Sequence, residues 1–186
     1  QRVVSRWTEH ENLEQHGPLV AKVATVMLCS LYGSICLYQG EELGLPEADV
    51  PYERLVDPYG LALWPEYKGR DGCRTPMPWA SGEHGGFTSV EPWLPVDGHH
   101  RQLSVEKQHA DAESTLNVTR QFLRWRKSQS AMVDGTLILS DFDDELLGWL
   151  RVSHDQAILA VFTLTEESRS TSLPDGAGEI VYQAGF

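Results

Sequence analysis

The sequence predicts an α/β unit followed by an antiparallel all-β module, and three stretches of the 186-residue chain indicate this order. An apolar stretch over 18–31 is followed closely by a second short apolar run at 35–38. A segment rich in proline and glycine covers 46–95, and after residue 135 short runs of branched residues alternate with acidic or small turn residues. A helix joined to a buried strand by a short connection is typical of a parallel sheet. Short runs separated by turn residues are typical of antiparallel strands.

Residues 18–32 are predicted to form a core helix, because apolar side chains surround most of its circumference. Pro18 suits the first turn of this helix and Gly33 suits its cap. The run is shorter than the roughly twenty apolar residues that cross a bilayer, so we expect no membrane partner. Residues 35–38 are predicted to form a strand buried on both faces. One strand cannot close a parallel sheet, so we expect the other strands upstream of Gln1 and the chain to be a fragment.

The segment 46–95 is predicted to be a long, ordered loop that carries a functional site. It holds eight of the ten prolines and six of the sixteen glycines, a density that argues against regular elements. It also holds Trp64, Trp79 and Trp93, and large aromatic residues do not suit a disordered linker. Ordered loops of this length usually serve a function.

The rest of the chain is predicted to be one amphipathic helix and a set of strands. Residues 112–128 return to helical spacing, with positive side chains late in the helix. The expected strands are 137–139, 147–152, 158–164 and 180–182. We place the boundary between the α/β part and the β module near 128–134.

Composition excludes several classes of partner. The chain has 15 basic and 27 acidic residues, a net charge of −12, and no basic stripe, so we expect no nucleic-acid partner. Its three cysteines form no CxxC pair, which argues against a zinc site and a disulfide framework. We expect no metal, no cofactor and a reducing, cytoplasmic location.

Three groups of residues could carry chemistry. Glu41 and Glu42 follow the predicted buried strand, at the end where parallel sheets place their sites, but adjacent carboxylates diverge, so anchoring of backbone amides is favoured over catalysis. The segment 68–79 places Arg70 and Arg74 among glycines and prolines; their guanidinium groups suit carboxylates or vicinal hydroxyls, with an ion pair of Arg70 to Asp71 or to a remote acid as the alternative. The histidines lack ligand spacing and are interpreted as solvated loop residues; they are His84, His99, His100 and His109.

In these segments the sequence resembles the α-glucosidases of the α-amylase superfamily, in the branch of oligo-1,6-glucosidases and sucrose hydrolases. The segment Gly-Arg-Asp-Gly-Cys-Arg-Thr-Pro-Met-Pro-Trp is the most specific match, and the likeness covers about residues 1–165. The matching segments are 2–7, 33–44, 69–79, and 86–88 together with 92–96.

This resemblance implies a fold and a set of site residues. Residues 1–130 would be the C-terminal portion of a (β/α)8 TIM barrel, from after the seventh strand through the last helix, and 131–186 a small antiparallel domain C. Members of this family are retaining glycosidases with three catalytic carboxylates. The motifs that carry these carboxylates would lie upstream of Gln1, so no catalytic residue is assigned here. Arg70 would pair with an upstream aspartate at the floor of the terminal-glucose subsite and make the enzyme exo-acting. Arg74, Arg2 and Arg6 would lie near the outer subsite.

The expected substrate is therefore a small oligosaccharide or sucrose. Two alternatives remain: a sucrose or trehalose isomerase or transglucosylase of the same superfamily, and a non-catalytic barrel homologue that acts as an ancillary subunit. We expect the chain alone to be inactive and to require either the rest of the barrel or self-association, because its core helix and strand would otherwise expose apolar surface.

Overall fold

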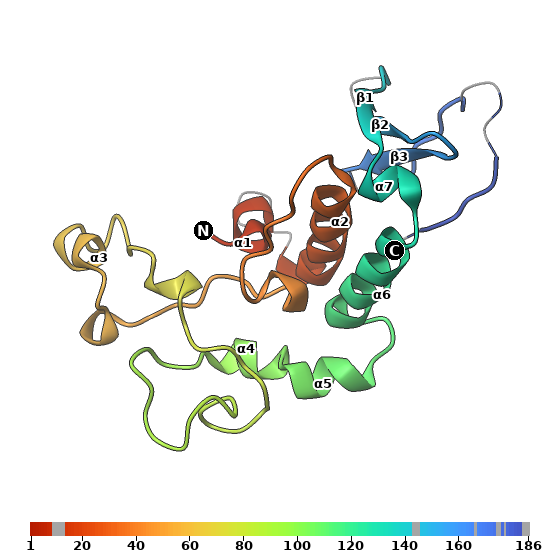
Figure 1. The fold of residues 1–186 in the computed structure, drawn as a ribbon. Coiled ribbons are helices and arrows are strands. Elements are labelled where there is room, and N and C mark those ends of the chain that lie inside the picture. The colour runs from red at the N-terminus through yellow and green to blue at the C-terminus, as the bar shows by residue number, and fades with distance from the viewer. Residues whose placement is uncertain (9–13, 143–145, 166, 174–175, 177, 184–186) are drawn as a thin grey trace. The chain divides into compact units, whose positions relative to one another are not determined.

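The computed structural model describes the chain except for residues 9–13, 143–145, 166, 174–175, 177 and 184–186 (Figure 1). It forms two compact units, one of residues 1–25 and 37–119 and the other of 26–36 and 120–186. Helices α2 (Gly17–Ser30) and α6 (Thr115–Lys127) each contribute residues to both units. The predicted helices 18–32 and 112–128 are thus found, each slightly shorter than expected.

The first unit is built from short helices and ordered loop. Its remaining elements are α1 (Val3–Thr8), η1 (Glu14–His16), η2 (Glu41–Leu43), η3 (Tyr52–Arg54), α3 (Pro58–Ala62), η4 (Asp71–Cys73), α4 (Gly98–Gln102) and α5 (Val105–Ala110). One core cluster joins the segment after η2 to the start of α6 through Leu43, Leu45, Met77 and Leu116. This core holds the chain on either side of the stretch 46–76, which carries Arg70.

The proline-rich segment 46–95 is ordered around a core of its own. Val50, Leu55 and Leu94 are buried together, with Trp64 packed against them. We expected the proline and glycine density to exclude regular elements. This expectation is wrong for short helical turns, because η3, α3 and η4 form here at three to five residues each. Trp79 and Trp93 are more than half exposed.

The predicted strand at 35–38 is not formed. The strands of the described residues pair only with one another, so the backbone of 35–38 has no neighbouring strand to complete its hydrogen bonds. Cys36 and Tyr38 are exposed. The expectation of burial on both faces is therefore wrong for this chain.

The second unit contains a three-stranded antiparallel sheet in the order β1-β2-β3 (Figure 1). The strands are β1 (Thr136–Leu139), β2 (Leu146–Val152) and β3 (Ala157–Thr163), preceded by α7 (Ser130–Val133). Ile138 pairs with Leu150, and Leu150 pairs in turn with Leu159. Three of the four expected strands are found. Residues 180–182 form no strand; instead the ring of Tyr182 packs against Phe122 and Trp125.

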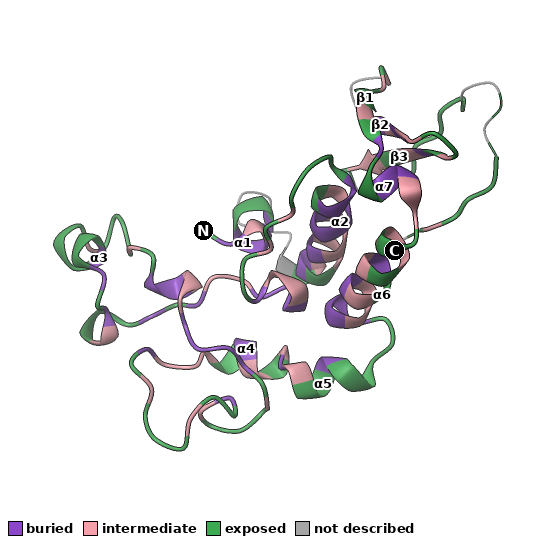
Figure 2. Cartoon of the chain, viewed as in Figure 1, coloured by how far each residue is buried: buried purple, intermediate pink, exposed green. Residues whose placement is uncertain are grey.

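Helix α2 is less covered than its apolar circumference predicts. Figure 2 shows buried positions along α2 interrupted by half-buried and exposed ones. Ala21, Ala24 and Cys29 are buried, whereas Leu28 is 36% exposed. No helix among the described residues is long and apolar enough to span a bilayer.

Candidate functional site

Two buried carboxylates hold the turn that carries Arg70. Asp71 is fully buried, and its Oδ2 accepts hydrogen bonds from the backbone N–H groups of Val56 (2.7 Å) and Asp57 (2.8 Å). The Asp57 carboxylate makes the reciprocal contact: its Oδ2 accepts a hydrogen bond from the backbone N–H of Arg70 at 2.8 Å. Each segment thus supplies a carboxylate that satisfies amides of the other. This exchange fixes the backbone of Arg70 without using its guanidinium group.

Arg70 pairs with a remote acid, Asp57, rather than with Asp71. Its Nε lies 3.6 Å from Asp57 Oδ2, and the Asp57 side chain is only 1% exposed while that of Arg70 is 57% exposed. The hydrogen bond from the Arg70 backbone N–H lowers the pKa of Asp57, helped by the Tyr59 N–H and by the charges of Arg70 and Arg74. Within the described part of the chain, the terminal guanidinium nitrogens of Arg70 donate no hydrogen bond. They are open to a ligand.

Glycines let the two segments come this close. Gly69 has φ +77°, a left-handed conformation that costs other residues energy, and a Cβ there would lie 3.0 Å from the Gly60 Cα. A Cβ on Gly60 would lie 2.7 Å from the Lys68 carbonyl oxygen. The close contact between these two segments therefore requires glycine at both 60 and 69.

The other three predicted arginines lie in different environments. Arg74 is half-buried at the end of η4, where its charge also acts on Asp57. Arg2 is 2% exposed, and its Nη1 and Nη2 donate to the carbonyl oxygens of Gln39 (2.6 Å) and Cys73 (3.2 Å). Arg6 is exposed on α1, and no contact among the described residues joins it to this turn. The structure thus brings Arg70, Arg74 and Arg2 to η4 and leaves Arg6 apart.

Glu41 and Glu42 anchor the loop, as expected from the sequence. Glu41 Oε2 accepts from the Tyr38 N–H at 3.0 Å, and Glu42 Oε2 accepts from the Gly40 N–H at 2.7 Å. Both carboxylates are engaged with backbone amides, which fits the anchoring interpretation rather than a catalytic one.

His100 is not a solvated loop residue, and that expectation was wrong. It is fully buried on α4, where Nε2 contacts the Pro46 carbonyl oxygen at 2.8 Å and Nδ1 lies 3.4 Å from Thr75 Oγ1. Burial lowers the pKa of His100. His99 and His109 are exposed and His84 is half-buried. No group of three His, Cys, Asp or Glu in the described part of the chain could hold a metal ion.

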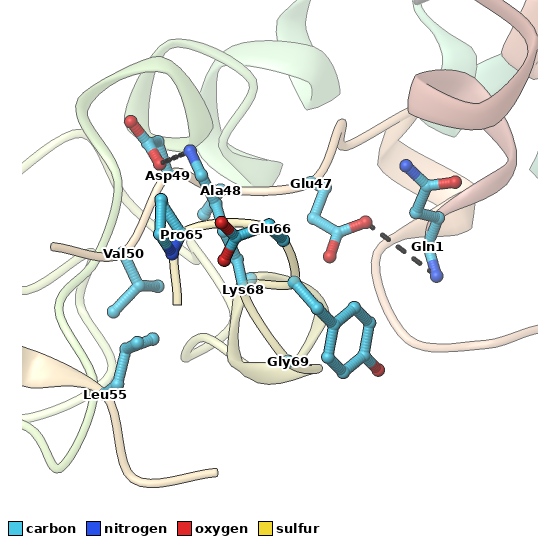
Figure 3. A pocket seen from close by; sticks show the side chains of 12 residues that line it. Gln1, Glu47, Ala48, Asp49, Val50, Leu55, Pro65, Glu66, Lys68 and Gly69 are labelled. Carbon is cyan, nitrogen blue, oxygen red and sulfur yellow. Dashed lines mark hydrogen bonds and ion pairs between the residues drawn. The ribbon is translucent and has the colours of Figure 1, made fainter. Parts of the chain in front are cut away.

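A cavity of about 690 Å³ opens beside the Arg70 turn (Figure 3). Gly69 and Gly72, on either side of Arg70 and Asp71, contribute to its wall. Its titratable side chains are the carboxylates of Glu47, Asp49 and Glu66, the Lys68 ammonium and the Tyr67 phenol. Lys68 Nζ lies 2.7 Å from Asp49 Oδ1, and Glu47 Oε2 lies 3.8 Å from the amino group of Gln1. Carboxylates and a tyrosine in a cavity of this size suit the hydroxyl groups of a sugar.

Sequence reasoning missed Asp57, the residue on which Arg70 rests. A local signal was present, because an aspartate followed by Pro58 is typical of a helix start. Asp57 is the N-cap of α3, and its Oδ1 accepts from the Tyr59 N–H at 3.0 Å. The cap could have been predicted, but the pairing with Arg70 needs the tertiary fold.

Comparison of the chain with known proteins identifies a matching family and several relatives. The alpha-amylase catalytic domain model matches residues 1–135. A probable alpha-glucosidase of Rhizobium meliloti (strain 1021) is 42% identical over 93% of this chain and 31% of its own length. The crystal structure of the alpha-glucosyl transfer enzyme XgtA superposes with a TM-score of 0.86 at 46% identity, over 96% of this chain and 32% of that chain.

A third relative is named for a phosphorylated substrate. The crystal structure of the Bacillus licheniformis trehalose-6-phosphate hydrolase (TreA) has a TM-score of 0.80 at 27% identity, over 95% of this chain and 35% of that chain. The chain spans about a third of the length of the relatives that it matches.

Proposed function

The chain belongs to the α-amylase catalytic-domain family, and from this premise we propose that it is part of a retaining, exo-acting α-glucosidase. The full-length enzyme would remove terminal α-linked glucose from short oligosaccharides or sucrose. Residues 1–130 would form the part of a (β/α)8 barrel that follows the seventh strand, and 131–186 a domain C. A homologue at 42% identity that is named a probable alpha-glucosidase supports the reaction class.

The geometry of Arg70 carries the proposal. Its Nε rests on the buried Asp57 carboxylate, and the same carboxylate fixes its backbone. Its side chain is more than half exposed; Arg70 does not itself line the cavity, whose wall includes the neighbouring Gly69. A guanidinium group held in this way is pre-organised to donate to the vicinal hydroxyls of a terminal sugar. Arg74 would support it from the other end of η4, and Arg6 would act nearer the outer subsite.

The bond-breaking groups would come from other parts of the longer protein. Retaining glycosidases use two carboxyl groups roughly 5–5.5 Å apart, one as nucleophile and one as acid/base. The carboxylates close to Arg70 are not suited to this work, because Asp57 and Asp71 are buried and engaged with backbone amides. This chain would therefore supply recognition of the substrate rather than catalysis.

The cavity favours uncharged sugars. Three carboxylates and one side-chain ammonium line it, and the Lys68 ammonium is already paired with Asp49. A phosphate group would meet like charges there. The substrate would then differ from the phosphorylated disaccharide named for the Bacillus licheniformis relative.

A second candidate function is glucosyl transfer. The structure of a 46% identical protein that is named an alpha-glucosyl transfer enzyme favours it. Both reactions pass through the same glycosyl-enzyme intermediate, which water intercepts in hydrolysis and an acceptor hydroxyl intercepts in transfer.

The experiment that tests the proposal uses the full-length enzyme with maltotriose. From maltotriose labelled on its reducing glucose, an exo-acting hydrolase first releases unlabelled glucose and labelled maltose, whereas cleavage of the other bond releases labelled glucose. With an added alcohol or sugar acceptor, free glucose dominates for a hydrolase and new glucosides dominate for a transferase. No cleavage of maltotriose, maltose or sucrose would refute both candidates.

We expect the 186-residue chain alone to leave p-nitrophenyl α-glucoside intact. We also expect it to associate, because Leu31, Tyr32 and Tyr38 expose large apolar side chains. Turnover by a preparation whose mass corresponds to these residues alone would contradict the first expectation, and a monomer in light scattering would contradict the second.

A further inference from the structure

Arg2 is a buried cation whose two terminal nitrogens both donate to the protein, while its Nε has no hydrogen-bond partner among the described residues. Its side chain is 2% exposed, and burial lowers its pKa. Within the described residues it lies within salt-bridge distance of no carboxylate. The neighbouring acids Glu41 and Glu42 accept from backbone amides. Its cation is stabilised instead by two carbonyl oxygens and by the Tyr38 ring, whose centroid lies 5.6 Å from the guanidinium carbon.

The two carbonyl groups that Arg2 holds belong to different segments. The Gln39 carbonyl lies directly before η2, and the Cys73 carbonyl lies at the end of η4. A second bond spans the same two segments, because Gln39 Nε2 donates to the Thr75 carbonyl oxygen at 3.4 Å. Arg2 therefore ties α1, the segment before η2 and the Arg70 turn together.

Cys73 is coupled to Arg70 within the turn. Both the N–H and the thiol of Cys73 contact the Arg70 carbonyl oxygen, at 3.3 Å and 3.1 Å. A shift of the Cys73 peptide is thus transmitted to Arg70 through a single helical turn. Since the Arg70 N–H also donates to Asp57, the Arg70 backbone is held on both sides.

Gly40 makes room for this arrangement. It has φ +89°, and a Cβ there would lie 2.7 Å from Arg2 Nη1 and 2.7 Å from Leu45 Cδ1. A methyl group at this position would displace the Arg2 guanidinium without removing its charge.

We propose that Arg2 is a positioning residue, which sets the orientation of Arg70 through the Cys73 carbonyl and does not itself bind the sugar. This inference rests on the proposed function, since Arg70 is there the residue that recognises terminal glucose. It differs from the expectation that Arg2 contacts an outer subsite.

The test is a double-mutant cycle in the full-length enzyme with maltose as substrate. Arg2→Met keeps the length of the side chain and removes its donors; we expect KM to rise about tenfold with a smaller change in kcat. In an Arg70→Ala background the same substitution is expected to change KM less than twofold, because its effect passes through Arg70. Gly40→Ala should reproduce the rise in KM, and Lys107→Met, which removes an exposed cation of the same unit, should leave KM unchanged.

Two readouts separate this role from others. If the increases in KM caused by Arg2→Met and by Arg70→Ala multiply in the double variant, the two residues act independently and the proposal is overturned. An Arg2→Met enzyme with lower thermal stability but an unchanged KM would also overturn it. Amide hydrogen exchange at 70–75 should accelerate in Arg2→Met whatever the reaction is. If the wild-type enzyme cleaves no α-glucoside, the proposed function fails, and exchange at 70–75 alone decides whether Arg2 holds the turn.

Discussion

Replacing Arg151 with methionine should strongly destabilise the second unit. Arg151 lies on β2 with its side chain fully buried, and it has no acidic partner among the described residues. Its Nη1 donates to the carbonyl oxygens of Ser30 (2.9 Å) and Leu31 (2.8 Å), and its Nη2 donates to those of Met132 (3.2 Å) and Gly135 (2.8 Å). It therefore caps the carbonyl end of α2 at Ser30 and Leu31 and joins it to the carbonyls of Met132 and Gly135; of these four carbonyls, Ser30 also accepts from the Trp149 indole N–H at 3.2 Å.

The expected loss follows from these four bonds. Hydrogen bonds from a charged donor contribute about 1.5–3 kcal/mol each, so the four contribute about 6–12 kcal/mol. Burial of the guanidinium, which also lowers its pKa, opposes this by several kcal/mol. Methionine keeps most of the volume but satisfies none of the carbonyls, so we expect the local free energy of opening to fall by about 3–5 kcal/mol.

Native-state amide hydrogen exchange of β1 and β2 measures this local free energy directly. Lys127→Met, which removes an exposed cation near the end of α6, serves as the control and should cost less than about 1 kcal/mol. A loss below about 1 kcal/mol for Arg151→Met would refute the reasoning, because the four bonds would then contribute little beyond the desolvation that they offset.

Three further predictions concern the Arg70 turn and its surroundings. Gly69→Ala should raise KM for maltose and cost about 1–3 kcal/mol of stability, since alanine must adopt φ +77° against Gly60; unchanged thermal unfolding would contradict it. Acid should loosen the unit in two stages. In the first stage, below about pH 6.5, the unfolded chain takes up a proton on histidine that buried His100 resists, so the folded state loses stability. In the second stage, near pH 4 and below, the stabilisation from the lowered pKa of Asp57 is lost as the pH falls through that pKa. A His100→Gln variant that kept the first stage would exclude His100 as its cause. Glu66→Lys should raise kcat/KM for maltose phosphorylated on its reducing glucose about tenfold relative to maltose, less so at high salt, with exposed Glu83→Lys as the control; an unchanged ratio would show that the cavity charge does not select the substrate.

Local patterns predicted much of the secondary structure. The expected strands 137–139, 147–152 and 158–164 agree with β1, β2 and β3 to within one residue at each end. They agree because each strand pairs with the next strand along the chain, so its partner lies only a few residues away in sequence. The runs at 35–38 and 180–182 are apolar as well but form no strand, since strand formation depends on a neighbour that the run itself does not specify.

The candidate site shows the same division between local and distant information. The anchoring role of Glu41 and Glu42 could be predicted because each accepts from an amide two or three residues away. The pairing of Asp57 with Arg70 and the burial of His100 against Pro46 depend on contacts across 13 and 54 residues. No periodicity or spacing encodes such contacts.

The most direct test of the central claim is the kinetics of Arg70 variants in the full-length enzyme. We predict that Arg70→Ala lowers kcat/KM for maltose and sucrose at least a hundredfold, and that Arg70→Lys recovers only part of it, because an ammonium cannot rest on Asp57 and donate to two hydroxyls at once. Kinetics of Arg70→Ala equal to those of the wild-type enzyme on both sugars would contradict the account.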